Sequence, residues 1–307
     1  MPRQNRRKPI DLENIEIIDT ATKGKSVAKY DGRIIFVKGG VPGDICNITV
    51  FKRRKKYWEA NINQIVKKSQ FRIDPICEHF GSCGGCKWQN MDYPSQLKFK
   101  QNEVLNNLTR IGGVTISKYN QILGCDEEYF YRNKMEFTFS NKRWLTQEEI
   151  ENNSVIENKD ALGFHVPGMF DKVINLKKCH LQKEPSNNIR LAVKEFADKN
   201  NLAYFDIRNQ TGLLRNLLIR TSTTNELMVL VQFFNNDTNK IKLLMNYINN
   251  TFKEITSLLY TINIKANNTL YDQDIFCFSG KNHITEEMDN LIFKIGPKSF
   301  FQTNSKQ

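Results

Sequence analysis

The stretch Cys77-Glu-His-Phe-Gly-Ser-Cys83-Gly-Gly-Cys86 places three cysteines within ten residues, in the spacing C-x5-C-x2-C. Glycines stand at positions 81, 84 and 85, and glycine reaches backbone dihedral angles that other residues avoid. The chain can therefore turn around one point and bring the sulfurs together. Thiolates at close quarters are favourable beside a metal ion or an iron–sulfur cluster, because the ion lowers the pKa of the thiols. The stretch predicts a metal or cluster site whose fourth ligand lies elsewhere in the chain.

The other four cysteines, Cys46, Cys125, Cys179 and Cys277, stand alone, and spacing does not choose the fourth ligand between Cys125 and Cys179. An odd total of seven does not suit a disulfide framework, and the clustering of three favours a metal or iron–sulfur site.

Residues 1–9 are basic but are followed by acidic residues rather than an apolar core, so they are not a secretory signal. We expect a cytoplasmic protein with no membrane partner.

The charge of the chain is concentrated at its N-terminal end. The 307 residues suffice for about two domains. Their net charge is +12, and residues 1–70 hold 16 Lys and Arg against 7 Asp and Glu, a surplus of +9. Such an asymmetry indicates an acidic polymer as partner, and nucleic acid is favoured over membrane because no apolar span accompanies the charge. A merely soluble basic surface remains an alternative.

Residues 10–70 alternate short β-rich segments with turns, which is typical of a small β-barrel. The expected strands are 26–30, 33–37, 44–51 and 58–66. Five consecutive cations at 52–56 stand where two strands would meet, with Tyr57 and Trp58 beside them. Phosphates bind cations and bases stack on aromatic rings, so this hairpin tip is a candidate RNA contact. The alternative that Trp58 turns into the barrel core stays open.

The rest of the chain mixes helices and strands, which indicates a second, mixed domain. Helical spacing of apolar residues predicts a helix that starts at Asp92 and ends at Gly112, and two more over 186–200 and 238–252, the last with Asp237 as its cap. Alternation predicts a hairpin of strands 214–221 and 227–233. Further β-rich segments are 131–139, 161–165, 172–176, 258–265, 274–278 and 291–301.

Around the third cysteine, Gly84-Gly-Cys86-Lys-Trp-Gln89-Asn-Met-Asp-Tyr93, followed by Gln96 and Lys100, resembles the cluster-containing uracil-C5 RNA methyltransferases. That family makes 5-methyluridine in 23S rRNA and tRNA. Val41-Pro-Gly-Asp44, after Gly32 and Arg33, resembles its TRAM domain, an OB-like RNA-binding barrel. Later landmarks follow in the family's order: Tyr131-Arg-Asn-Lys134, Gly163-Phe164, Cys179-His-Leu-Gln182, Gly212-Leu-Leu-Arg-Asn216 and Phe300-Phe-Gln-Thr-Asn304.

The resemblance assigns ligands, cofactors and a partner. It implies that Cys77, Cys83, Cys86 and Cys179 bind a 4Fe-4S cluster and that Gln302 contacts S-adenosylmethionine. RNA is the expected partner, rRNA more than tRNA, and a monomer is expected. The three remaining cysteines match nothing functional in the family, and we expect small buried hydrophobes there.

The resemblance also implies a fold class and domain boundaries. It describes an α+β chain with an OB-like TRAM barrel at 1–70 and a mixed α/β central domain at 71–292, which carries the cluster and RNA-binding hairpins. Because the sequence has no glycine-rich strand-to-helix loop, the family's C-terminal Rossmann-like methyltransferase domain is expected to be missing, with 293–307 as its beginning. No catalytic residue is assigned, and the chain alone is expected to be inactive. Residues 300–307 are then expected to be loosely held.

Two alternatives from other classes remain open. A radical-adenosylmethionine methylthiotransferase also combines a TRAM barrel with a cluster, but it needs the spacing C-x3-C-x2-C. A non-catalytic RNA-binding module with a structural zinc is the other, since four cysteines suit tetrahedral zinc.

Overall fold

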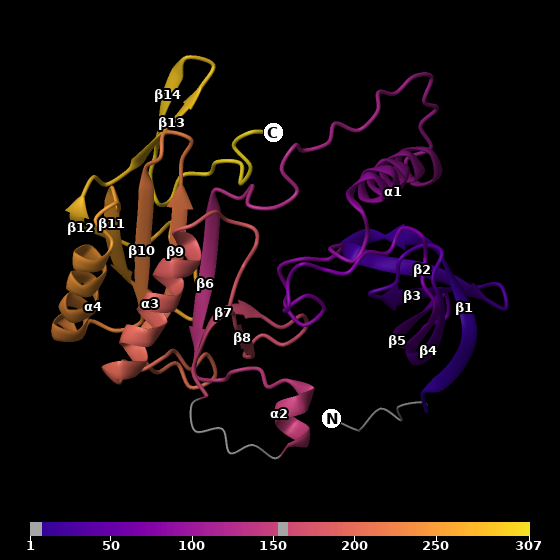
Figure 1. Ribbon diagram of the computed structural model, residues 1–307, viewed down its shortest axis with the longest axis horizontal. Coiled ribbons are helices and arrows are strands. Elements are labelled where there is room, and N and C mark those ends of the chain that lie inside the picture. Colours follow the sequence, from indigo (N-terminus) through magenta and orange to yellow (C-terminus); the bar gives the residue numbers. More distant parts are fainter. Residues whose placement is uncertain (1–7, 153–158) are drawn as a thin grey trace. The chain divides into compact units, whose positions relative to one another are not determined.

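The computed structural model describes residues 8–152 and 159–307 (Figure 1). It contains two compact units, Met1–Gly81 with Gly85–Asp126, and Ser82–Gly84 with Glu127–Gln307. The domain divisions predicted after residues 70 and 292 stay predictions. Within the described part of the chain, no helix is long and apolar enough to cross a membrane.

The first unit contains a closed barrel in which the strands follow the order β1-β2-β3-β5-β4. β3 and β5 are parallel, and the other neighbours are antiparallel. Alternate side chains of each strand enter the interior, as the two-residue period of a strand requires. The strands are β1 (Ile10–Ala21), β2 (Lys25–Tyr30), β3 (Arg33–Lys38), β4 (Ile45–Arg53) and β5 (Tyr57–Lys67).

β1 is absent from the strands predicted by sequence. Its Leu12, Ile15 and Ile17 are buried, whereas Glu13 and Glu16 face solvent. A register shift between Leu12 and Ile15 breaks the regular alternation, so the segment does not show the simple pattern of a strand.

Asp44, the last residue of the Val41-Pro-Gly-Asp44 turn, lies directly before β4 and has a buried carboxylate. Its oxygens accept hydrogen bonds from the backbone N–H of Val41 at 2.7 Å and of Ser69 at 2.9 Å. Arg72 binds both oxygens, through Nε at 3.0 Å and Nη2 at 2.6 Å. Burial alone would raise the pKa of Asp44, but the hydrogen bonds from Arg72 and from the two N–H groups outweigh it and hold the pKa below the usual value. The turn therefore joins the start of β4 to the segment that follows β5.

Helix α1 (Tyr93–Asn106) follows the cysteine stretch and begins where the sequence predicts. The Asp92 side chain caps it by accepting a hydrogen bond from Ser95 N at 2.9 Å. Phe99 packs with Val41 and Met91, which fixes the helix to the barrel within the first unit. A short 3-10 turn (Thr22–Gly24) lies after β1, and a π turn (Asn107–Ile111) extends α1 to Gly112.

The second unit is built on a seven-stranded sheet in the order β12-β11-β10-β9-β6-β7-β8. β10 and β11 are its one parallel pair among the described residues, and helix α4 connects them. The strands are β6 (Lys134–Ser140), β7 (Ala161–His165), β8 (Val173–Asn175), β9 (Leu214–Thr221), β10 (Leu227–Phe233), β11 (Ser257–Ile262) and β12 (Ile275–Gly280).

Helices α3 (Ser186–Lys199) and α4 (Thr238–Thr251) lie side by side (Figure 1). The rings of Phe196 and Tyr247 stack between them, with centroids 4.0 Å apart. Both helices lie where the sequence predicts, and Asp237 caps α4 through Lys240 N at 3.1 Å. The β9–β10 hairpin is also confirmed. A short helix α2 (Gln147–Glu151) and a separate hairpin, β13 (Ile284–Met288) with β14 (Leu291–Ile295), complete the unit. The strand predicted over 291–301 ends at Ile295.

Candidate functional site

The cysteine stretch is organised in the first unit by Gln89, whose side chain is almost fully buried. Its Oε1 accepts a hydrogen bond from the backbone N–H of Cys77 at 3.3 Å, and its Nε2 donates to Cys86 Sγ at 3.2 Å. One amide therefore spans both ends of the stretch. An N–H donor directed at sulfur stabilises a thiolate, and such bonds tune thiolate ligands of iron–sulfur clusters.

Gly84 is held by strand β7 of the second unit, to which residues 82–84 belong. Its N–H donates to the carbonyl oxygen of His165 at 3.2 Å. A Cβ at position 84 would lie 2.7 Å from that oxygen, so this approach requires glycine.

Cys179 is fixed in the second unit by Asn187 of α3. Its N–H donates to Asn187 Oδ1 at 2.8 Å, and Asn187 Nδ2 donates to the Cys179 carbonyl oxygen at 3.0 Å. The buried Arg190 donates to the same Oδ1 at 3.2 Å. Cys179 thus sits in a rigid backbone setting, beside a buried cation that favours a thiolate.

The four cysteines predicted as cluster ligands are divided between the two units. Among the residues it describes, no three His, Cys, Asp or Glu side chains are grouped so that they could hold a metal ion. Cys77 and Cys86 lie in the first unit, and Cys83 and Cys179 in the second. The donor set nevertheless fits iron–sulfur chemistry, because the thiols at 86 and 179 have an amide donor or a cation beside them.

The three other cysteines differ from one another. Cys46 is fully buried in the barrel core, and burial together with the nearby Asp44 carboxylate raises its pKa to about 11, so the prediction of a small buried hydrophobe is confirmed. Cys125 is half-buried, and its N–H donates to Tyr93 Oη at 2.7 Å. Cys277 is exposed on β12, so the prediction of a buried side chain is wrong there.

The segment that contains Gln302 is anchored by Asn133, which precedes β6. Asn133 Nδ2 donates to the Gln302 carbonyl oxygen and to Ser305 Oγ, both at 2.7 Å, and Asn133 N donates to the Thr303 carbonyl oxygen at 2.8 Å. The Gln302 side chain is exposed, so its amide is available to a ligand. Gln302 is the one described residue to which the sequence assigns a cofactor contact.

Residues 296–299, which precede this segment, are held by a second set of hydrogen bonds. Arg220 of β9 donates to the carbonyl oxygens of Gly296 at 2.9 Å and Ser299 at 3.0 Å, and Ser305 Oγ donates to the buried Glu286 at 3.1 Å. The prediction that residues 300–307 are loosely held is therefore wrong. Asn133 lies in the quoted Tyr131-Arg-Asn-Lys134 motif, but sequence gave no sign that it binds a segment about 170 residues away.

The β4–β5 hairpin carries fewer available cations than the sequence predicts. Lys52 forms an ion pair with Glu59, whose side chain is 13% exposed, and Arg53 Nη2 donates to the Lys8 carbonyl oxygen at 3.2 Å. The hydrogen bonds from Lys52 and Lys25 hold the pKa of Glu59 below its usual value. The exposed cations at the turn, here called the cation tip, are Arg54, Lys55 and Lys56.

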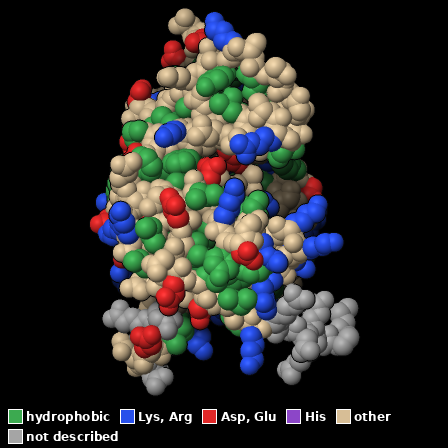
Figure 2. Space-filling model, turned by 90° about the vertical axis from the view of Figure 1, so that its right-hand side faces the viewer, with side chains coloured by type: hydrophobic (Ala, Val, Ile, Leu, Met, Phe, Trp, Pro, Cys, Tyr) green, Lys and Arg blue, Asp and Glu red, His purple; other side chains and the backbone are tan. Residues whose placement is uncertain are grey.

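Trp58 is partly buried against the barrel core, and the Arg33 guanidinium lies 5.2 Å from its ring. Its ring is thus occupied by intramolecular contacts, which favours the alternative in which Trp58 is structural. Lys and Arg side chains are interspersed with apolar ones on the face shown in Figure 2, rather than gathered into one field.

The sequence has close relatives among proteins described as RNA methyltransferases. An uncharacterized RNA methyltransferase of Bacteroides thetaiotaomicron is 47% identical over 290 residues, covering 94% of this chain and 64% of that protein. One of Porphyromonas gingivalis is 44% identical, covering 95% of this chain and 64% of its own length. The chain is similar to RNA methyltransferases. It spans about 64% of the length of these two relatives, and no protein-family model matches it.

The fold is also found in a solved methyltransferase structure. The Pyrococcus abyssi tRNA (uracil-54, C5)-methyltransferase, crystallised with S-adenosyl-L-homocysteine, aligns with a TM-score of 0.64 and 23% identity. The alignment covers 95% of this chain and 61% of that chain.

This match corrects the predicted fold class. The prediction defined the fold class by a domain that the chain would lack, and this is wrong, because 95% of this chain, including the barrel and the seven-stranded sheet, itself aligns with 61% of a methyltransferase chain. The prediction took the lack of a glycine-rich loop in the sequence as the mark of a missing domain. A short loop motif reports on one phosphate-binding turn and does not define a fold.

Proposed function

We propose that this chain binds RNA for the S-adenosylmethionine-dependent methylation of a uracil at C5, as a member of the uracil-C5 RNA methyltransferases. The observation that carries the proposal is the 47% identity, over 94% of the chain, to a protein described as an RNA methyltransferase. The likeness of the fold to a tRNA uracil-C5 methyltransferase supports the choice of uracil C5.

The chemistry requires that the RNA be held with the target base out of its stack. Uracil C5 becomes nucleophilic only after a thiolate has added at C6, and both atoms are covered in a stacked base. S-adenosylmethionine supplies the methyl group as an electrophile. We assign RNA binding to the cation tip and a cofactor contact to Gln302, whose backbone is held by Asn133. We assign no residue of this chain as nucleophile or base.

The RNA is the partner we propose, and the cytoplasm, where rRNA and tRNA are modified, is the proposed location. The family resemblance favours rRNA, whereas the solved neighbour is named for tRNA.

The test of RNA binding is a filter-binding titration of the protein with unmodified 23S rRNA fragments, with unmodified tRNA and with duplex DNA of equal length. We expect one RNA to bind more tightly than DNA at 150 mM salt. Equal affinity for all three would contradict an RNA-specific role.

We further propose that Cys77, Cys83, Cys86 and Cys179 are the ligands of a 4Fe-4S cluster with a structural role. The support is the donor set: Gln89 donates to Cys86 Sγ, and Asn187 with Arg190 fixes Cys179. A cluster with four cysteine ligands would join the stretch at 77–86 to the segment that follows β8, and its binding free energy would contribute to folding.

A further inference from the structure

The second unit contains a pocket of about 350 Å³ at the ends of β6, β7 and β8, which the sequence did not reveal. Residues 141–145, which follow β6, line it. Arg143 N donates to the Lys159 carbonyl oxygen at 2.8 Å, and Trp144 N donates to the Val173 carbonyl oxygen at 2.8 Å. Val173 N in turn donates to the Lys142 carbonyl oxygen at 3.2 Å. These bonds tie residues 142–144 to β8 and to Lys159, which lies just before β7, so this part of the pocket is held by backbone contacts.

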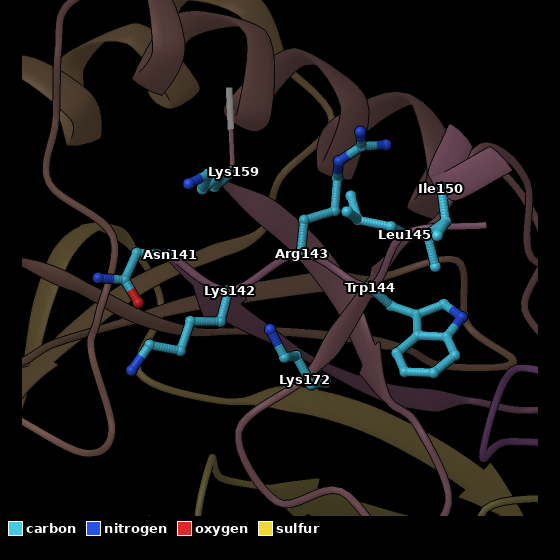
Figure 3. Close-up of a pocket in the computed structure, with 8 residues that line it drawn as sticks. All are labelled: Asn141, Lys142, Arg143, Trp144, Leu145, Ile150, Lys159 and Lys172. Carbon is cyan, nitrogen blue, oxygen red and sulfur yellow. The ribbon is translucent and has the colours of Figure 1, made fainter. Parts of the chain in front are cut away.

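The lining is divided into a cationic and an apolar side. Figure 3 shows the amino groups of Lys142, Lys159 and Lys172 on one side of the pocket. Trp144, Leu145 and Ile150 lie on the other side, and Arg143 lies between the two groups in this view.

Two of the four cations form no ion pair within the part of the chain that the structure describes. Lys142 pairs with Asp206 at 3.2 Å, and Arg143 pairs with Glu149 at 2.8 Å. Lys159 and Lys172 form no ion pair with any described Asp or Glu, and Asp171, the acid next to Lys172, is bound by Arg208 at 2.5 Å. Among the described residues, these two amino groups therefore lie outside any ion pair, in a pocket with an aromatic wall.

We infer that this pocket binds one nucleotide of the RNA. Lys159 and Lys172 would bind its phosphate, and Trp144 would stack on its base. An ammonium pair and an indole at opposite sides of one pocket match the two ends of a nucleotide, and cations with aromatic platforms are the usual means of holding single-stranded RNA. The volume, near the lower limit of small-ligand pockets, suits a single nucleotide.

The inference rests on the proposed function, and uridine 5′-monophosphate is the probe that tests the pocket separately. Calorimetry should show that the mononucleotide binds more tightly than inorganic phosphate. Trp144→Leu should weaken its binding by about 5- to 150-fold, the range of base stacking, and should leave phosphate binding unchanged. Equal affinity for both probes, or an unchanged affinity in Trp144→Leu, would overturn the assignment.

The RNA arm uses Lys159→Gln and Lys172→Gln, with the exposed Lys242→Gln of α4 as the matched control. Each pocket variant should reduce the log–log salt slope of RNA binding by about 0.7, while the control leaves it unchanged. Thermal melts within about 2 °C of the wild type show that the variants are folded. Wild-type slopes in both pocket variants would refute the inference and leave the proposed function intact. Failure of the wild-type protein to bind any RNA would instead refute the proposed function. The calorimetric titration with uridine 5′-monophosphate would then still show whether the pocket binds a nucleotide.

Discussion

Asp44 and Arg72 form an ion pair whose side chains are 0% and 10% exposed. Removing the carboxylate charge leaves the guanidinium buried without its partner, which typically costs about 3 to 5 kcal/mol. We therefore expect Asp44→Asn to lower the free energy of unfolding by an amount in that range, measured by urea denaturation at pH 7. The control, Asp126→Asn, changes an exposed carboxylate and should shift stability by less than about 0.5 kcal/mol. A loss below 1 kcal/mol in Asp44→Asn would show that the ion pair is not structural.

Glu226 makes the free energy of unfolding depend on pH. The hydrogen bond from Lys281 Nζ at 2.7 Å and those from Thr285 hold the pKa of Glu226 at about 2, against an ordinary value of 4.5. Its stabilisation is therefore complete above pH 4.5 and is lost as the pH falls towards 2. Glu226→Gln should lower the free energy of unfolding by about 1 to 3 kcal/mol at pH 7, and the deficit should shrink across that window. Glu195→Gln, which alters an exposed pair with Lys199, is the control. An equal deficit at pH 7 and pH 2.5 would contradict the assignment.

Individual residues were predictable from the sequence where the chemistry is local. Asp92 and Asp237 cap their helices as the sequence predicts, because a cap depends on residues three positions away. The roles of Gln89 and Asn133 were not predictable, because each depends on contacts that only the folded chain creates. Cys277 is exposed because β12 is the edge strand of its sheet, a position that composition does not reveal.

At the scale of elements, long periodic segments were predicted well and irregular ones were not. α3, α4 and the β9–β10 hairpin lie within one residue of the predicted bounds, because apolar side chains recur there at regular spacing. β1 contains a bulge, and β13 is a short strand with two glutamates, so neither shows a clear alternating pattern. The pocket at the ends of β6, β7 and β8 joins segments from separate parts of the sequence, which no local pattern reports.

The exposed cations of the β4–β5 hairpin can be tested for RNA binding by substitution. Replacing Arg54, Lys55 and Lys56 by glutamine should reduce the log–log salt slope of RNA binding by about 0.7 for each contact that is lost. Lys52→Gln should have a smaller effect on the slope, because Lys52 is paired with Glu59. Filter binding between 50 and 300 mM salt measures both. A slope unchanged in the triple variant would place the RNA contact elsewhere.

At the scale of the whole molecule, the cluster assignment predicts a difference between two cysteines that spacing treated alike. Anaerobically reconstituted protein should contain about four irons, and Cys179→Ala should lose them while Cys125→Ala retains them. Iron and zinc contents, measured together, separate the cluster from the zinc alternative. Full iron content in Cys179→Ala would remove Cys179 from the ligand set, and stoichiometric zinc without iron would replace the cluster by a zinc site.

We propose that this protein serves the methylation of uracil at C5 in RNA, so its loss should be visible in the modified nucleosides of cellular RNA. The measurement is the 5-methyluridine content of purified rRNA and tRNA, by nucleoside mass spectrometry, in cells with the encoding gene intact, disrupted and restored. We expect that disruption removes 5-methyluridine from one site in one RNA class and that restoring the gene returns it. Unchanged 5-methyluridine at every site in both RNA classes after disruption would contradict it.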